Sequence, residues 1–274
     1  MSTPDARQDE SALGAPASDL PILNPLVEDE DLPEDRRTVL ITGASGNIGR
    51  KLREAWRETY DLVLIDARPD PDDPEVVVAD LAEWDEEWVN LFYEADAVIH
   101  LAGNPNEFAA WDELVRPNMD ALFNVFHASA QGGVERLIFA SSNHAMGEYQ
   151  PRAESPLTVD LPPRPDGPYG GLKLAGERLG ISLARAYGLS FIGIRIGWVQ
   201  RGENRPETMP HDWAVRMWLS NADLVRLFER AIEAELDEGE YAIVNGMSNN
   251  AGMRWSLAEA EARLGYRPQD GVAS

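Results

Sequence analysis

The chain has 274 residues, of which 43% are hydrophobic, and its formal net charge at pH 7 is -24. This length and apolar content suit one large α/β domain, or two small ones, with a substantial core. Such an acidic surface would repel nucleic acid and anionic membranes, so we expect neither as a partner. The chain has no cysteine, which excludes disulfides and thiolate chemistry.

The first 37 residues contain five prolines and many acids but no aromatic residue. Such a segment cannot bury enough apolar surface to fold alone, so we predict a disordered acidic tail at 1–37 and one domain at 38–274. No signal segment and no bilayer-length apolar run is evident, which predicts a cytoplasmic protein. The acidic excess together with the scarcity of lysine fits adaptation to salt. A high-GC coding bias would explain the preference for arginine over lysine equally well.

The first predicted strand and helix flank a glycine-rich turn. The stretch RTVLITGASGNIGRKLREAW begins with an apolar run at 39–42 and continues with Ile48, Leu52 and Trp56 at helical spacing. Its turn follows the pattern G-x-x-G-x-x-G, at Gly43, Gly46 and Gly49. Glycines at such a turn let a pyrophosphate approach the backbone at a helix N-terminus. The spacing therefore predicts a dinucleotide-binding turn.

A second predicted strand, DLVLID, ends in Asp66, roughly 20 residues beyond the glycine turn. A carboxylate at this position can bind both ribose hydroxyls of NAD and would repel the 2′-phosphate of NADP. We therefore predict NAD as the cofactor. Arg68 leaves NADP open as an alternative, and Asp66 could instead only cap the next turn.

Four further apolar stretches follow, with helical sequence between them: EVVVADL, ADAVIHLAGN, RLIFASSNHAMG and SFIGIRIGW. Nearly continuous apolar strands that alternate with helices are typical of a parallel sheet, so we predict an α/β fold with a Rossmann-type, doubly wound sheet. Ligands of such sheets bind at the carboxyl ends of the strands. The residues placed along that rim are Gly43, Asp66, Asp80, Gly103, Ser142 and Ile196.

The chain has only two lysines, and one of them, Lys173, follows Tyr169 by four positions. Residues four apart on a helix share a face, so the ammonium would lie beneath the phenol. An ammonium is a compact charge that can lower the pKa of a neighbouring phenol, whereas a guanidinium binds as a planar fork. The spacing also arises by chance, so its interpretation as a proton-transfer pair depends on the other motifs.

Taken in chain order, these motifs resemble the short-chain dehydrogenase/reductase superfamily, in its extended, NAD-dependent epimerase/dehydratase branch. The likeness runs from about Thr38 to Asp270 and depends on TGASGNIG, Asp66, ADL, HLAG, Asn118, SSNH and YGGLK. Within that branch, ASSNHAMG and MWLS look like uronate dehydrogenases and haloarchaeal NAD-dependent glucose-6-phosphate dehydrogenases. The resemblance implies a Rossmann-type domain with small substrate-binding elements at about 143–168 and 198–274.

The resemblance also implies roles for individual residues. Tyr169 would take the hydroxyl proton as hydride leaves for the nicotinamide, Lys173 would stabilise the phenolate, and Ser142 would hold the reacting oxygen. The residues implied for NAD are Gly43, Ser45, Gly46, Asn47, Ile48, Gly49, Asp66, Asp80, Leu81, Leu101, Ala102, Gly103, Asn118, Tyr169, Lys173 and Ile196. Those implied for the sugar are Asn104, Ser142, Asn143, His144, Tyr169, Trp198, Arg201 and Arg216. No spacing among the histidines suggests a metal site.

Several alternatives remain for these residues. His144 could bond to backbone, and the arginines could be solvated surface charges. Pro105 stands where uronate dehydrogenases have a serine, Trp213 where they have an arginine for the sugar carboxylate, and Leu172 where the family usually has a serine.

The implied reaction is oxidation of the anomeric hydroxyl of a free or phosphorylated sugar to a lactone. The roughly 235 residues of the predicted domain favour a small substrate. A nucleotide-sugar epimerase or dehydratase shares most of the motifs, and a non-catalytic, NAD-binding regulatory protein is a third possibility. By analogy with the extended branch, we expect a homodimer that pairs the helix of Tyr169 and the helix before it.

Overall fold

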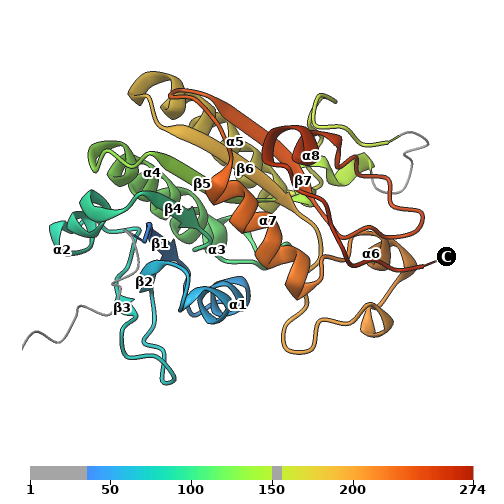
Figure 1. The fold of residues 1–274 in the computed structure, drawn as a ribbon, viewed down its shortest axis with the longest axis horizontal. Helices are drawn as coiled ribbons and strands as arrows, with labels where there is room; N and C mark the ends of the chain where they lie inside the picture. The colour runs from blue at the N-terminus through green and yellow to red at the C-terminus, as the bar shows by residue number, and fades with distance from the viewer. Residues whose placement is uncertain (1–35, 150–155, 274) are drawn as a thin grey trace, which may run out of the picture. The chain divides into compact units, whose positions relative to one another are not determined.

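The computed structural model describes residues 36–149 and 156–273. The predicted tail at 1–37 lies outside these residues except for its last two positions. Seven strands form one parallel sheet in the order β3-β2-β1-β4-β5-β6-β7 (Figure 1). The strands are β1 (Thr38–Thr42), β2 (Asp61–Asp66), β3 (Val77–Val78), β4 (Ala97–His100), β5 (Arg136–Ser142), β6 (Ser190–Ile196) and β7 (Tyr241–Gly246). The predicted α/β fold of the Rossmann type is confirmed.

Helices cover both faces of the sheet. The α-helices are α1 (Asn47–Trp56), α2 (Glu86–Val89), α3 (Trp111–Val115), α4 (Ala121–Gln131), α5 (Pro168–Tyr187), α6 (Asp212–Arg216), α7 (Asn221–Glu233) and α8 (Ala258–Leu264). The 3-10 segments are η1 (Asn90–Glu94), η3 (Asn143–Tyr149) and η4 (Pro206–Thr208), and η2 (Arg116–Asp120) is a π-helical segment. Helices α1, α7 and α8 pack on one face, whereas α2, α4 and α5 pack on the other.

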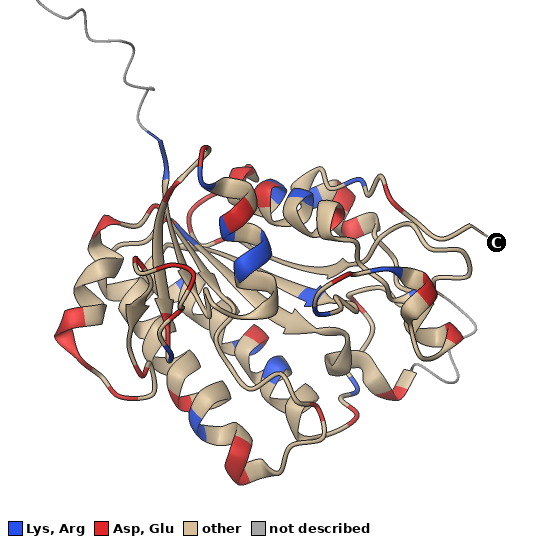
Figure 2. Cartoon of the chain, turned by 90° about the horizontal axis from the view of Figure 1, so that it is seen from below, with Lys and Arg blue, Asp and Glu red and all other residues tan. Residues whose placement is uncertain are grey.

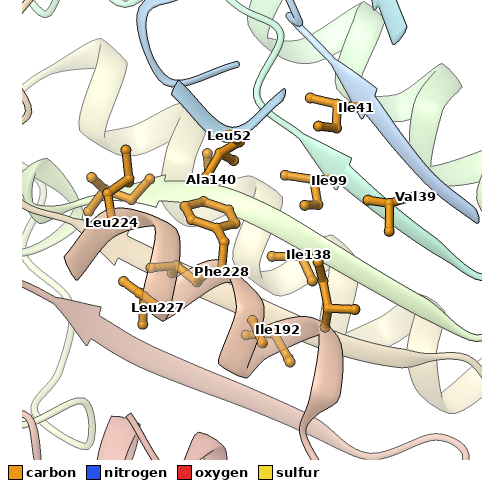
Figure 3. Close-up of a cluster of buried hydrophobic side chains, with 14 of the residues drawn as sticks. Val39, Ile41, Leu52, Ile99, Ile138, Ala140, Ile192, Leu224, Leu227 and Phe228 are labelled. Carbon is orange, nitrogen blue, oxygen red and sulfur yellow. The ribbon is translucent and has the colours of Figure 1, made fainter. Parts of the chain in front are cut away.

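Alternate side chains of the strands enter the two cores because successive residues of a strand point to opposite faces. Ile41 packs toward α1 and α7, while its neighbour Leu40 packs toward α4. Figure 3 shows the first of these cores, in which the strand residues Ile138 and Ile192 lie beside Phe228 of α7.

The structure differs from the sequence analysis at both edges of the sheet. The stretch EVVVADL was predicted as a buried strand, but only Val77–Val78 pairs, and these side chains are 39% and 54% exposed. β3 has only two residues, and neither of them belongs to a buried core, so their side chains receive little cover. The opposite edge is β7, which was not predicted, and it pairs with β6 over residues 241–246.

Charged residues lie mainly on helices and loops. Figure 2 shows the acidic positions spread over these elements rather than gathered on one of them. In the part of the chain that the structure describes, no helix combines the length and apolar character needed to cross a membrane.

Candidate active site

The carboxyl ends of the central strands open into a cavity of about 1080 Å³. It extends from the glycine turn after β1, past the ends of β4 and β5, to the loop after β6. Every predicted site residue lines this cavity except Asn118 and Arg216. Residues from distant parts of the chain therefore meet at the rim, where the parallel sheet places its strand ends.

Asn118 lies behind the cavity wall. It is 4% exposed, and its side chain accepts a hydrogen bond from the Asn104 N–H (2.7 Å) and donates to the Asn104 carbonyl (3.0 Å). Asn118 thus holds the backbone of Asn104, which lines the cavity. Arg216 ends α6 with its guanidinium beside Gly252, away from the cavity lining.

The glycine turn requires the absence of side chains. Gly43 has a φ of +74°, and a Cβ at this position would lie 2.8 Å from the Ala102 backbone nitrogen. A Cβ at Gly49 would lie 2.4 Å from the Gly43 carbonyl oxygen. The strand, the turn and α1 can pack this closely only because both positions are glycine. The N-terminus of α1, at Gly46, has no side-chain cap, so its N–H groups can bind an anion.

Asp66 lies beside this turn and hydrogen-bonds to its backbone. Its carboxylate accepts hydrogen bonds from the backbone N–H groups of Ser45 (3.0 Å) and Arg68 (3.2 Å) and lines the cavity. The Ser45 hydroxyl is buried and has no hydrogen-bond partner among the described residues. A buried hydroxyl without a partner is costly, and a phosphate oxygen would satisfy it. The uncapped helix, the unsatisfied hydroxyl and the carboxylate fit the pyrophosphate and ribose of a dinucleotide.

Tyr169 and Lys173 lie one turn apart near the start of α5, which begins with Pro168 at its first position. Lys173 is 8% exposed and donates a hydrogen bond to the Ala140 carbonyl (2.8 Å). Its Nζ lies 5.6 Å from the centre of the Tyr169 ring. The helix therefore places the ammonium beneath the phenol, as the four-residue spacing predicts.

Burial is the main cause of the pKa shifts of both Tyr169 and Lys173. Burial lowers the pKa of Lys173 to about 8. Burial also raises the pKa of Tyr169 to about 12, although a hydrogen bond with Ser142 acts in the opposite direction and the charge of Glu107 adds to the rise. The sequence analysis expected a neighbouring cation to lower the pKa of this phenol. In the protein alone, desolvation sets the direction of the Tyr169 pKa shift and the charge of Lys173 is not among its causes, so a phenolate needs further positive charge beside it.

Ser142, Asn143 and His144 follow one another at the end of β5. The Ser142 hydroxyl donates to the Asn143 side-chain carbonyl (3.1 Å) and accepts from the His144 N–H (3.2 Å). Asn143 is further held by its amide, which lies 2.8 Å from Met217 Sδ. His144 lies edge-on to the Tyr169 ring and its Nδ1 bonds to a carboxylate, so the backbone-bonded alternative is not what the structure shows.

The loop after β6 forms the wall opposite these residues, and it is tied to α1. The Asn47 amide donates to the Val199 carbonyl (3.0 Å). Lys51, the other lysine of the chain, donates to Asn47 Oδ1 (2.8 Å) and to the Gln200 carbonyl (3.4 Å). The first turn of α1, at the dinucleotide turn, thereby anchors the loop that carries Trp198 and Arg201.

Several lining residues were not assigned a site role from sequence. They include Arg50, Glu107, Trp213 and Met217. Trp213 stands out because its ring lies 5.8 Å from that of Trp198, which gives the cavity an aromatic wall. Its position in the sequence was noted only as the place of an expected arginine. No local pattern marks Trp213 and Met217, because they reach the cavity through the long connection after β6.

The fold and this cavity define a Rossmann-type, dinucleotide-binding protein. The profile of the NAD dependent epimerase/dehydratase family matches residues 39–245, and the chain belongs to that family. The resemblance seen in the motifs is confirmed, and NAD is the cofactor.

Similar proteins extend over most of the chain. The L-arabinose 1-dehydrogenase (NAD(P)(+)) of Haloferax volcanii is 36% identical over 251 residues, which cover 86% of this chain and 98% of that protein. The NAD-dependent glucose-6-phosphate dehydrogenase of the same organism is 38% identical over 254 residues, or 86% of this chain and 94% of that protein. A crystal structure of uronate dehydrogenase from Agrobacterium tumefaciens superposes with a TM-score of 0.72 at 31% identity, covering 86% of this chain and 85% of that one.

Proposed function

We propose that this protein oxidises the anomeric hydroxyl of a sugar to a lactone, with NAD as the hydride acceptor. The observation that carries this proposal is the single cavity that joins the dinucleotide turn to Ser142, Tyr169 and Lys173. The names of the similar dehydrogenases, which specify arabinose, glucose 6-phosphate and uronate, support a sugar as the substrate class.

The chain's own residues handle the proton. The glycine turn and Asp66 would hold the cofactor, whose oxidised nicotinamide would supply the acceptor for the hydride that leaves the anomeric carbon. Tyr169 takes the hydroxyl proton, and Ser142 holds the oxygen from which it leaves. Lys173 is protonated below its pKa of about 8, and its ammonium stabilises the phenolate that the reaction needs. A binding protein without chemistry would have no use for these three groups together.

The substrate end of the cavity combines polar and aromatic groups. Asn104, Asn143 and His144 offer hydrogen-bonding groups for hydroxyls, whereas Trp198 and Trp213 offer flat surfaces for the ring of a sugar. Arg201 is the arginine of this loop that lines the cavity, so we assign it to a phosphate or carboxylate if the substrate carries one.

Replacement of Tyr169 by phenylalanine tests the proposal. We expect Tyr169→Phe to bind NAD as the wild type does but to lose activity by at least about a hundredfold, because the proton acceptor is gone. Tyr93→Phe, at an exposed position in η1 that does not line the cavity, is the matched control and should be fully active. Initial rates with arabinose, glucose 6-phosphate and glucuronate would be measured with NAD and with NADP. Unchanged activity in Tyr169→Phe would refute the mechanism, and inactivity across the panel together with conversion of a nucleotide sugar would favour an epimerase.

We also propose that two copies pair through α4 and α5. Phe123 on α4 and Tyr187 on α5 are 56% and 59% exposed, and burial of such side chains favours association. Sedimentation should show a dimer, and Phe123→Asp should shift it to monomer. A wild-type protein that sediments only as a monomer would contradict this proposal.

A further inference from the structure

The His144 side chain is held by a residue that the sequence analysis did not identify. His144 Nδ1 lies 2.8 Å and 3.0 Å from the two carboxylate oxygens of Asp166, in the loop before α5. The centre of the His144 ring lies 5.7 Å from that of Tyr169, which it meets edge-on, and both residues line the cavity. The pair therefore lies beside the phenol that takes the proton in the proposed reaction.

Two glycines make room for the carboxylate. A Cβ at Gly147 would lie 2.0 Å from Asp166 Oδ2, and a Cβ at Gly170 would lie 3.2 Å from Asp166 Oδ1. A Cβ at Gly170 would also come within 2.3 Å of the His144 carbonyl oxygen. A side chain at Gly147 would displace the Asp166 carboxylate, so the glycine at this position lets Asp166 reach His144. The two side chains are 22% and 33% exposed, and both carboxylate oxygens lie within hydrogen-bond distance of Nδ1.

The chemistry of the pair determines where the imidazole proton lies. A carboxylate only accepts hydrogen bonds, so Nδ1 of His144 must be the donor. A neutral imidazole carries one N–H, and its other nitrogen is then an acceptor. With Nδ1 committed to Asp166, Nε2 is the nitrogen of His144 that remains for a ligand.

We propose that Asp166 is a positioning residue that holds His144 in the Nδ1–H tautomer, so that Nε2 accepts a hydrogen bond from a sugar hydroxyl near the reacting carbon. This inference rests on the proposed function for its substrate. It adds a requirement for substrate specificity, since the substrate group that contacts Nε2 must be a hydrogen-bond donor. A hydroxyl satisfies that rule, whereas a methoxy or deoxy group at the same place leaves a polar nitrogen without a partner.

The tautomer can be measured without any activity. The imidazole ¹⁵N chemical shifts of the labelled wild-type protein distinguish a protonated nitrogen from an unprotonated one, and the loss of signals in His144→Asn identifies those of His144. We expect the proton on Nδ1 at a pH where the ring is neutral. A wild-type His144 with its proton on Nε2 would overturn the proposal, whether or not the protein is a sugar dehydrogenase.

A double-mutant cycle tests whether Asp166 acts through His144. We expect Asp166→Asn to lower kcat/KM for the sugar by roughly tenfold to a hundredfold, the effect of losing a charge-assisted hydrogen bond, with the Kd for NAD unchanged. In the His144→Asn background, the same replacement should cost nothing further. An equal cost in both backgrounds would show a purely structural role and refute the proposal. If no sugar is oxidised by the wild type, the proposed function fails, while the NMR result still decides the tautomer.

Discussion

Glu177 and Arg195 form a buried ion pair beneath the proposed proton-transfer residues, and its removal should be costly. Both side chains are 2% exposed, and Arg195 donates to the two carboxylate oxygens over 2.9 and 2.8 Å. Glu177→Leu would leave the guanidinium charge uncompensated in the interior, so we expect the free energy of unfolding to fall by about 3–5 kcal/mol.

The double replacement Glu177→Leu/Arg195→Met should recover most of this loss, because it removes both charges and keeps apolar volume. The Ser141 hydroxyl donates to Glu177 over 2.6 Å, and its lost bond should leave a deficit of about 1 kcal/mol. Arg195 Nη1 has no partner among the described residues, so the wild-type pair is itself incompletely satisfied. A net gain from the pair over apolar packing is therefore not expected.

Urea unfolding of the three proteins measures these free energies. Glu233→Leu is the control, since Glu233 pairs with Arg230 over 3.6 Å at the surface, where both side chains are more than half exposed, and such pairs contribute less than about 1 kcal/mol. The reasoning is refuted if Glu177→Leu costs no more than this control, or if the double variant is less stable than Glu177→Leu alone.

Three further predictions concern Lys173, Asp66 and Lys51. Burial lowers the pKa of Lys173 to about 8 from 10.5, so the unfolded chain binds more protons between these values and the stability contribution of Lys173 should rise with pH across them. Thermal melts of Lys173→Met should lack this rise, and an unchanged pH profile would count against it. Asp66→Ser should lower kcat/KM with NAD by roughly tenfold, because the carboxylate that binds the ribose is gone, and should raise kcat/KM with NADP, because the same carboxylate repels a 2′-phosphate. Steady-state rates that show an undiminished preference for NAD would contradict this prediction. Lys51→Met should raise KM for the sugar by roughly two- to tenfold, because the loop after β6 loses its hydrogen bond from Lys51 at the Gln200 carbonyl. Steady-state kinetics measures this, and an unaltered KM would disprove the anchoring role.

The parts of this protein that could be predicted from the sequence are those that neighbouring residues determine. The glycine turn, the carboxylate after the second strand and the pairing of Tyr169 with Lys173 all depend on short spacings, which backbone geometry converts directly into positions. The rim of strand ends followed from the alternation of strands and helices, because parallel strands end at the same edge. The prediction of a buried strand was wrong at Val77–Val78. Side-chain exposure depends on which elements cover a strand, and the local sequence does not determine that.

Only the tertiary structure decided how the remaining groups meet. Asp166 reaches His144 from 22 residues away, and Asn47 holds the Val199 carbonyl from 152 residues away. The same holds for the buried contact of Glu177 with Arg195 and for the placement of Trp213 in the cavity wall. These contacts arise from packing between elements whose separation along the chain carries no periodic signal. The sequence by itself therefore determined the fold class and the glycine turn with its carboxylate, whereas packing determined which side chains line the rest of the cavity.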